Sequence, residues 1–214
     1  MNILKNELID RTQVIKETIR YLGYKRNIMS KEYAVDERTK VLIESSLEEL
    51  EQVINVQFIY RILEICFEPE NRLKIGKLQI ESNSLYRNLK DCENVIVMCI
   101  TLGADVDRII KKYAIIDLSR AVVLQACAAA LLEEYCDRLE EILNRQLEQE
   151  LQKNIYFRPR FSPGYGDFSI LHQRELLEMT EANKMIGLSM TDGYMLTPTK
   201  SVTALIGISN IKNT

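Results

Sequence analysis

The sequence predicts an α+β fold, in which a mixed or antiparallel sheet is flanked by helices and one long helix is central. Before residue 55, apolar residues recur at helical spacing. After it, segments with strand patterns and segments with helical patterns follow one another without regular βαβ alternation. An unbroken helical pattern without Gly or Pro runs from Asp117 to about Lys153. We therefore expect an N-terminal helical region over 1–55 and an α+β core over 56–214.

Two helices are predicted in the first region. The segment from Leu4 to Tyr21 carries apolar residues at helical spacing and ends before Gly23. Asp36 is suited to begin the second helix, because its carboxylate can accept the free N–H groups of a first turn. The residues from Gly23 to Val35 are expected to form the connecting loop.

The next segments read mainly as strands. Val56–Ile65 is rich in β-branched and aromatic residues, and Arg72–Ile80 alternates polar with apolar residues, so each predicts one strand. We expect the two to pair as a hairpin across Glu68–Asn71. Val95–Ile100 is a continuous apolar run, which is typical of a central strand. Between them, Ser82 or Ser84 can cap a short helix that ends near Leu89.

The second half of the chain is dominated by the long helix. A helix from Ala104 to Lys112 precedes it. The first half of the long helix is rich in alanine and is expected to be buried. The second half, Glu133–Glu150, is amphipathic and charged and is expected to emerge into solvent. The remaining predicted elements are a strand at 155–158, a helix at 169–179 with a further turn to 186, and a final buried strand at 202–208.

Composition excludes several classes of protein. The net charge is -3, with 28 Lys and Arg spread among 31 Asp and Glu, so no basic stripe predicts a nucleic-acid partner. No apolar run reaches the roughly 18 residues that predict a membrane span. The five cysteines are odd in number and form no CxxC motif, which indicates reduced and mostly buried thiols in a cytoplasmic protein.

The least ordinary stretch is the loop from Arg158 to Asp167. Two prolines fix the backbone angle φ, and two glycines permit tight turns, so the loop can present backbone groups to a ligand at little entropic cost. Arg160 offers a planar fork of N–H donors that suits a carboxylate.

Arg160-x-x-x-Gly164-Tyr165 resembles the Arg-x-x-x-Gly-Tyr signature of the activation domain of cobalamin-dependent methionine synthase. Further segments follow in the order of that family, and the resemblance covers roughly Val95–Ser209. These segments are Thr101–Gly103, Cys136–Glu141, Gly164–Asp167, Gln173–Leu177, Ile186–Met190 and Pro198–Val202.

The resemblance implies that the chain binds S-adenosylmethionine. Arg160 would pair with the methionyl carboxylate, Ser162 and Gly164 would give backbone contacts, and Glu141 would be an acid near the ligand. Tyr165 would both contact the ligand and stand at the cobalt face, which makes it the catalytic candidate. The family also has an N-terminal aspartate that meets the ligand's amine, for which no counterpart is assigned here.

The same resemblance implies the partners. Cobalamin would arrive on a cobalamin-dependent methionine synthase or related corrinoid protein, because the chain lacks the Asp-x-His-x-x-Gly sequence of cobalamin-binding domains. The chain would assist reductive remethylation of that cobalamin by positioning the methyl group, with a flavodoxin-type protein as a possible electron donor.

Other interpretations stay open. Arg160 could pair with a nearby acid such as Asp167, and Tyr165 could cover the core. His172 is the only histidine and is expected on a helix surface, which disfavours a zinc site or a catalytic dyad. The alternative function is a non-catalytic interaction or regulatory protein that keeps the fold without binding the ligand. A methyltransferase in its own right is disfavoured, because no Gly-x-Gly-x-Gly loop follows a first strand.

Overall fold

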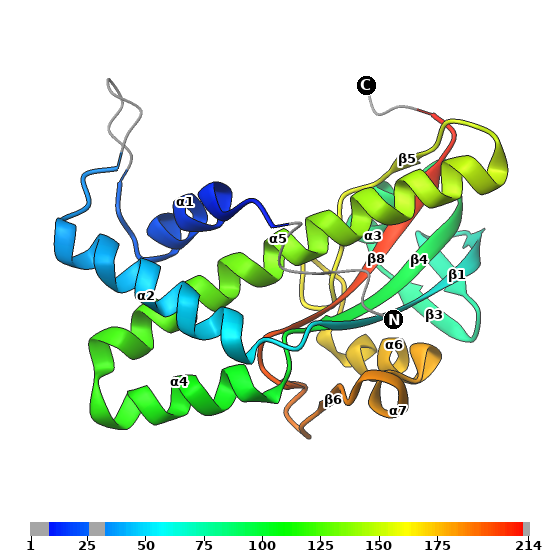
Figure 1. Ribbon diagram of the computed structural model, residues 1–214. Coiled ribbons are helices and arrows are strands. Elements are labelled where there is room, and N and C mark those ends of the chain that lie inside the picture. Colours follow the sequence, from blue (N-terminus) through cyan, green and yellow to red (C-terminus); the bar gives the residue numbers. More distant parts are fainter. Residues whose placement is uncertain (1–8, 26–32, 212–214) are drawn as a thin grey trace. The chain divides into compact units, whose positions relative to one another are not determined.

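The computed structural model of the chain describes residues 9–25 and 33–211 (Figure 1). These residues form two compact units, neither of which is continuous in sequence. One unit is helical and comprises Met1–Val56, Leu102–Leu139 and Pro198–Lys200, and the other contains the sheet and comprises Gln57–Thr101, Glu140–Thr197 and Ser201–Thr214. The predicted α+β class is confirmed, as is the long helix. In the described part of the chain, no helix combines the length and the apolar content needed to cross a membrane.

The sheet unit is built on six antiparallel strands in the order β3-β2-β1-β4-β8-β5. Figure 1 shows the two long strands β4 and β8 side by side near its middle. The strands are β1 (Gln57–Glu68), β2 (Arg72–Ile75), β3 (Leu78–Glu81), β4 (Cys92–Thr101), β5 (Tyr156–Phe157) and β8 (Ser201–Ser209). The predicted central strand, the final buried strand and the hairpin that pairs Glu68 with Arg72 are therefore confirmed.

One strand prediction is wrong. The segment 72–80 is two short strands, β2 and β3, which fold back on each other with Ile75 opposite Leu78. The turn between them passes through Gly76, whose φ is +58°, a left-handed conformation that glycine adopts without steric cost. Alternation of polar and apolar residues continues through the turn, so the pattern alone cannot locate it.

Helix α3 packs on the sheet unit through apolar side chains. Helix α3 (Asn83–Leu89) begins at Ser82, whose hydroxyl accepts the N–H of Leu85 at 3.0 Å, and buries Leu85 and Leu89. Their hydrophobic cluster also contains Phe168, which follows the Pro/Gly loop directly.

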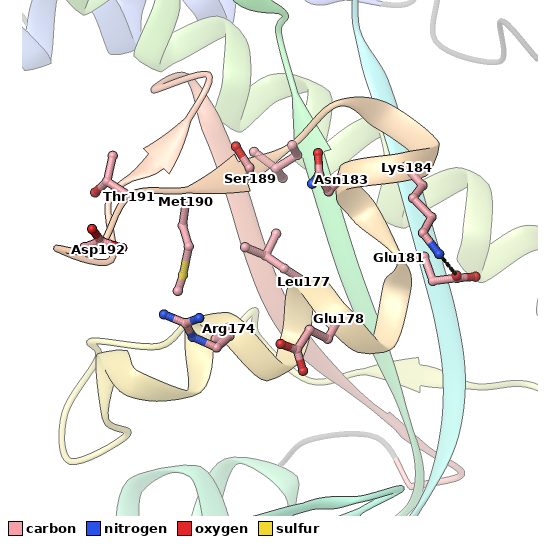
Figure 2. Close-up of a pocket in the computed structure, with 11 residues that line it drawn as sticks. Arg174, Leu177, Glu178, Glu181, Asn183, Lys184, Ser189, Met190, Thr191 and Asp192 are labelled. Atoms are coloured by element: carbon pink, nitrogen blue, oxygen red, sulfur yellow. Dashed lines mark hydrogen bonds and ion pairs between the residues drawn. The ribbon is translucent and has the colours of Figure 1, made fainter.

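The chain after the loop forms a series of short elements. A short 3₁₀ turn (Ile170–His172) leads into α6 (Gln173–Thr180) and α7 (Ala182–Ile186), followed by the small hairpin of β6 (Ser189–Met190) and β7 (Leu196–Thr197). Figure 2 shows that α6 and α7 meet at a sharp corner, which Glu181 makes with a φ of +53°. The hairpin is absent from the sequence prediction because two-residue strands carry no measurable period.

The helical unit contains α1 (Arg11–Tyr21), α2 (Glu37–Val53), α4 (Ala104–Ile116) and the first part of α5 (Leu118–Leu151). Asp10 and Asp36 cap α1 and α2 with their carboxylates. The cap at Asp36 was predicted, but the first described helix begins at Arg11, and residues 4–8 of its predicted range lie outside the described residues.

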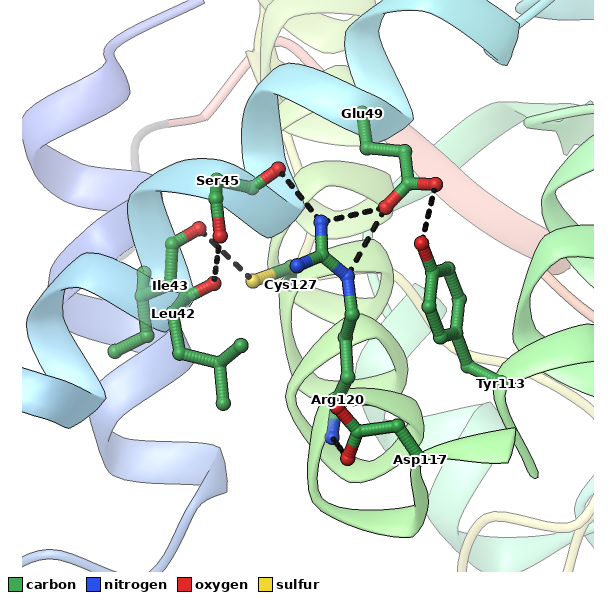
Figure 3. A network of polar contacts seen from close by, with 8 residues as sticks. All are labelled: Leu42, Ile43, Ser45, Glu49, Tyr113, Asp117, Arg120 and Cys127. Atoms are coloured by element: carbon green, nitrogen blue, oxygen red, sulfur yellow. Dashed lines mark hydrogen bonds and ion pairs between the residues drawn. The ribbon is translucent and has the colours of Figure 1, made fainter. Parts of the chain in front are cut away.

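A polar network ties three helices of this unit together (Figure 3). Arg120 of α5 donates from Nε and Nη2 to Oε2 of Glu49 on α2, at 3.1 and 2.7 Å. The hydroxyl of Tyr113 on α4 donates to the other oxygen of the same carboxylate at 3.0 Å, and the guanidinium lies over the tyrosine ring. Both carboxylate oxygens of Glu49 thus accept hydrogen bonds, which tie α2 to α4 and α5.

The long helix α5 has buried residues from Ala121 to Leu147. Its alanine-rich first half is buried, as predicted. In its second half Leu143 and Leu147 are also buried, so this half does not emerge as a solvated arm, and only its charged face is open.

The free cysteines are mostly buried, as predicted: Cys66 is exposed and the other four are buried. Burial raises the pKa of Cys99 to about 11 and that of Cys127 to about 12.

Candidate functional site

The Pro/Gly loop is held against the edge of the sheet by backbone hydrogen bonds. Arg158 donates its N–H to the carbonyl of Gly207 on β8 at 2.8 Å. Phe161 and Leu205 exchange both of their backbone hydrogen bonds at 2.9 Å. Arg160 lies between these two anchored positions, so its backbone is fixed even though it belongs to a loop.

Beyond Phe161 the chain makes a compact bend. Tyr165 donates its N–H to the carbonyl of Ser162 at 3.1 Å, and the N–H of Phe168 bonds to the carbonyl of Tyr165 at 2.9 Å. The N–H of Gly164 closes the bend on the carbonyl of Phe168 at 2.8 Å. Gly164 adopts a φ of +95°, which explains why a glycine stands there.

Asp167 fastens the bend to α3. Its carboxylate accepts the hydroxyl of Ser82 at 2.5 Å and the backbone N–H groups of Asn83 and Ser84 at 2.8 and 3.0 Å. These bonds favour the ionised form, chiefly the one from Ser82, and hold the pKa of Asp167 well below its usual range.

Gly166 brings the bend against the same helix. It adopts a φ of +54°, and a Cβ added there would lie 2.8 Å from Oγ and 3.0 Å from Cβ of Ser84. A glycine is therefore required both by the backbone angle and by the approach of α3. The bend is rigid on this side.

Arg160 forms an ion pair with Glu140 of α5. Both side chains are about one-fifth exposed, at 20% and 21%, so the pair is partly screened from water. The alternative in which Arg160 pairs with Asp167 is wrong, because the Asp167 carboxylate is taken up by the first turn of α3.

A shallow groove of about 360 Å³ lies along α5 beside this ion pair. Glu140 and Glu141 line it together with Asn144, Arg145 and Phe157. Glu141 is half-exposed, and its carboxylate is 4.0 Å from Arg145, one turn further along the helix. The structure thus places two of the predicted site residues at one groove, Glu141 in its wall and Arg160 through its bond to Glu140.

The other predicted site residues lie in the bend. The Tyr165 side chain is 57% exposed, and its ring meets that of Phe161 edge-on with centroids 6.2 Å apart. Its hydroxyl forms no hydrogen bond with any residue in the described ranges, so it is open to a partner. The N–H of Gly164 is used within the bend, which leaves its carbonyl for a ligand, and Ser162 is half-buried. The ligand roles of Arg160, Ser162, Gly164, Tyr165 and Glu141 stay predictions.

Two aspartates of the helical unit cap helices, and neither is assigned as the N-terminal aspartate that the resemblance implies. Asp10 donates its N–H to Oε1 of Glu134 on α5 at 3.2 Å, while its carboxylate accepts the N–H of Thr12 at 3.0 Å. The carboxylate of Asp36 is instead held by Thr39 on α2.

Sequence reasoning missed Glu140 and the role of Asp167. Glu140 stands next to Glu141 in a charged stretch, and nothing in the sequence distinguishes which acid faces Arg160. Asp167 bonds to the first turn of α3 from more than eighty residues away in the sequence, so no local pattern predicts this contact. His172 stacks on Phe168 with centroids 5.4 Å apart, and its side chain is more covered than a helix-surface histidine. Among the described residues, no three His, Cys, Asp or Glu side chains are grouped to hold a metal ion.

Comparison with known proteins gives two matches. The family described as "Vitamin B12 dependent methionine synthase, activation domain" matches residues 82–211, which is more than half of the chain. A solved structure described as the MetH reactivation domain bound to AdoHcy superposes with a TM-score of 0.66 over 97% of this chain and 76% of that chain, at 14% identity. At that identity the likeness is one of fold. No curated protein matches the sequence significantly.

Proposed function

The chain belongs to the activation-domain family of vitamin B12-dependent methionine synthase, and from this membership we propose that it binds S-adenosylmethionine and assists reductive remethylation of cobalamin on a partner protein. The partner would be a cobalamin-dependent methionine synthase or a related corrinoid protein, with a flavodoxin-type protein as electron donor. The observation that carries the proposal is the placement of Arg160. Its backbone is anchored to β8 on both sides, and its side chain pairs with Glu140, which lines an acidic groove.

The charges of this groove suit the ligand. S-adenosylmethionine carries a carboxylate, an ammonium and a sulfonium, so it presents one negative and two positive groups. Arg160 supplies a cation for the carboxylate, and Glu140 and Glu141 supply anions for the positive groups. A guanidinium has five N–H donors, so one arginine can serve more than one carboxylate.

The bend gives Tyr165 its proposed place. When bound, S-adenosylmethionine would supply the methyl group for the partner's cobalamin, with an electron from the separate donor. The residues of this chain hold the ligand and orient it. The Tyr165 ring, exposed and braced by Phe161, offers a flat contact for the incoming partner. The contribution of the chain is proximity and orientation, without acid–base chemistry.

Titration calorimetry with S-adenosylmethionine tests the proposal. We expect wild type to bind and Arg160→Ala to bind more weakly by about 2 kcal/mol or more, because a partly buried charge-assisted contact to the ligand carboxylate is lost. The control is Arg72→Ala, which removes an arginine paired to an acid elsewhere in the sheet unit and should leave affinity unchanged. Thermal melting confirms that each variant is folded.

Two outcomes would overturn the proposal. If wild type shows neither heat of binding nor a rise in melting temperature with excess ligand, even with a cobalamin protein present, the chain does not bind S-adenosylmethionine. The alternative of a non-catalytic interaction or regulatory protein would then stand. If Arg160→Ala binds as tightly as wild type, the ligand site lies elsewhere.

A further inference from the structure

A second depression lies in the sheet unit, formed by α6, α7 and β6 (Figure 2). It has a volume of about 400 Å³, which is within the range of small-molecule sites. None of its lining residues belongs to the Pro/Gly loop or to the groove beside Arg160. They are Arg174, Leu177, Glu178, Glu181, Asn183, Lys184, Leu188, Ser189, Met190, Thr191 and Asp192.

Two left-handed residues shape the depression. Glu181, with a φ of +53°, ends α6 and turns the chain into α7, and Gly187, with a φ of +65°, ends α7 and turns it into β6. The two corners bring β6 back over α6, so that Met190 and Arg174 face each other in Figure 2. Backbone geometry thus sets the shape of the depression.

The floor of the depression is apolar. Leu177 and Leu188 are buried and belong to one hydrophobic cluster, against which the half-buried Met190 packs. Methionine adapts to irregular shapes, so this floor can accept an aliphatic or thioether side chain.

The rim carries charges of both signs that do not neutralise each other. The side chain of Arg174 forms no ion pair or hydrogen bond with any residue of the described ranges, although Glu178 is one helical turn away and Asp192 also lines the rim. The side chains of Glu178 and Asp192 likewise have no such partner within these ranges. By contrast, Lys184 pairs with Glu181 at 3.3 Å, so these two charges cancel locally.

We propose that this depression binds a zwitterionic α-amino acid with an apolar side chain. A ligand that is only an anion would be repelled by Glu178 and Asp192, and one that is only a cation would be repelled by Arg174. A zwitterion satisfies both sides of the rim. Its carboxylate meets Arg174, its ammonium meets the two acids, and its side chain covers Leu177 and Met190. The inference does not depend on the binding of S-adenosylmethionine at Arg160.

The probes are L-leucine and L-methionine, measured by chemical-shift perturbation and titration calorimetry. Two analogues of leucine each lack one charge: 4-methylpentanoate has no ammonium, and 3-methylbutylamine has no carboxylate. We expect at least one amino acid to bind in the millimolar range or tighter, and both analogues to bind at least tenfold more weakly. Shifts should fall on the amides of α6 and β6.

Variants separate this site from the first. Arg174→Ala should weaken amino-acid binding at least tenfold, and Glu178→Gln should do so at least threefold, because both side chains are exposed and their loss leaves the fold intact. Arg87→Ala, an exposed arginine on α3, is the control that should change nothing. In Arg160→Ala the shifts on α6 and β6 should match those of wild type, which separates this depression from the groove beside Arg160. The inference is overturned if neither amino acid binds at about 20 mM, if the single-charge analogues bind equally well, or if Arg174→Ala binds like wild type.

Discussion

Replacing Gly166 by alanine should destabilise the sheet unit by about 3 kcal/mol. An alanine held at the observed φ of +54° costs about 1–2 kcal/mol, because its Cβ crowds the carbonyl of its own residue. The new Cβ would also lie 2.8 Å from Oγ and 3.0 Å from Cβ of Ser84. The hydroxyl can rotate away, but the Ser84 Cβ cannot. The bend and α3 must then separate by a few tenths of an ångström, and such overpacking costs about 1–3 kcal/mol.

The matched control is Gly187→Ala. Gly187 has a similar φ of +65°, and no atom lies within 4 Å of an added Cβ, so it carries the backbone cost without the clash. We expect a loss of about 1.5 kcal/mol for this variant. For a chain of this size each kcal/mol lowers the melting temperature by roughly 2–4 °C. The expected shifts are therefore about 6–12 °C for Gly166→Ala and about 3–6 °C for Gly187→Ala.

Thermal unfolding followed by circular dichroism, with urea titration at 25 °C as a second measurement, gives both values. The reasoning is refuted if Gly166→Ala is no less stable than Gly187→Ala. That result would mean that α3 does not approach the bend as closely as the structure shows.

Three further outcomes follow from the described contacts. The folded state holds the pKa of Asp167 below the unfolded value of about 3.9, so the contribution of this carboxylate to stability is complete above that value and is lost as pH falls below it. Asp167→Asn should therefore flatten the acid limb of a profile of melting temperature against pH. Glu49 and Arg120 are each 22% exposed, and a double-mutant cycle with alanine at both positions in urea should give a coupling energy of about 1 kcal/mol, with strict additivity as the contrary result. Cys66 should react with a thiol reagent in the native protein at pH 8. Burial raises the pKa of Cys99 to about 11, so its thiol should react only on unfolding. Mass spectrometry of the labelled peptides checks both results.

Local patterns in the sequence were sufficient for most elements. Asp36 and Ser82 predict the starts of helices because their side chains accept N–H groups within three residues, which is a purely local interaction. The run Val95–Ile100 announces β4 because a strand buried on both faces has no polar positions. The sequence pattern did not predict the turn at Gly76, because polar and apolar residues keep alternating through it.

The site was predictable only in part, since its contacts join distant residues. The loop and its Arg160 stand out in the sequence through proline and glycine content. The partner of that arginine, Glu140, is twenty residues away on α5, and the next residue, Glu141, is also a glutamate. Helical register relative to the loop decides which of the two faces Arg160, and a single sequence does not encode that register visibly. The depression beneath Arg174 and Met190 depends likewise on two backbone corners, one of them at the non-glycine residue Glu181.

The most direct test of the central claim, that Arg160 holds the amino-acid end of S-adenosylmethionine, compares two ligands on two proteins. Calorimetry should be run with S-adenosylmethionine and with its decarboxylated form, on wild type and on Arg160→Ala. We predict that wild type prefers the intact ligand by about tenfold or more, and that the variant binds both ligands equally weakly, as a charge-assisted contact to the carboxylate requires. A variant that keeps the wild-type preference for the carboxylate would contradict the account.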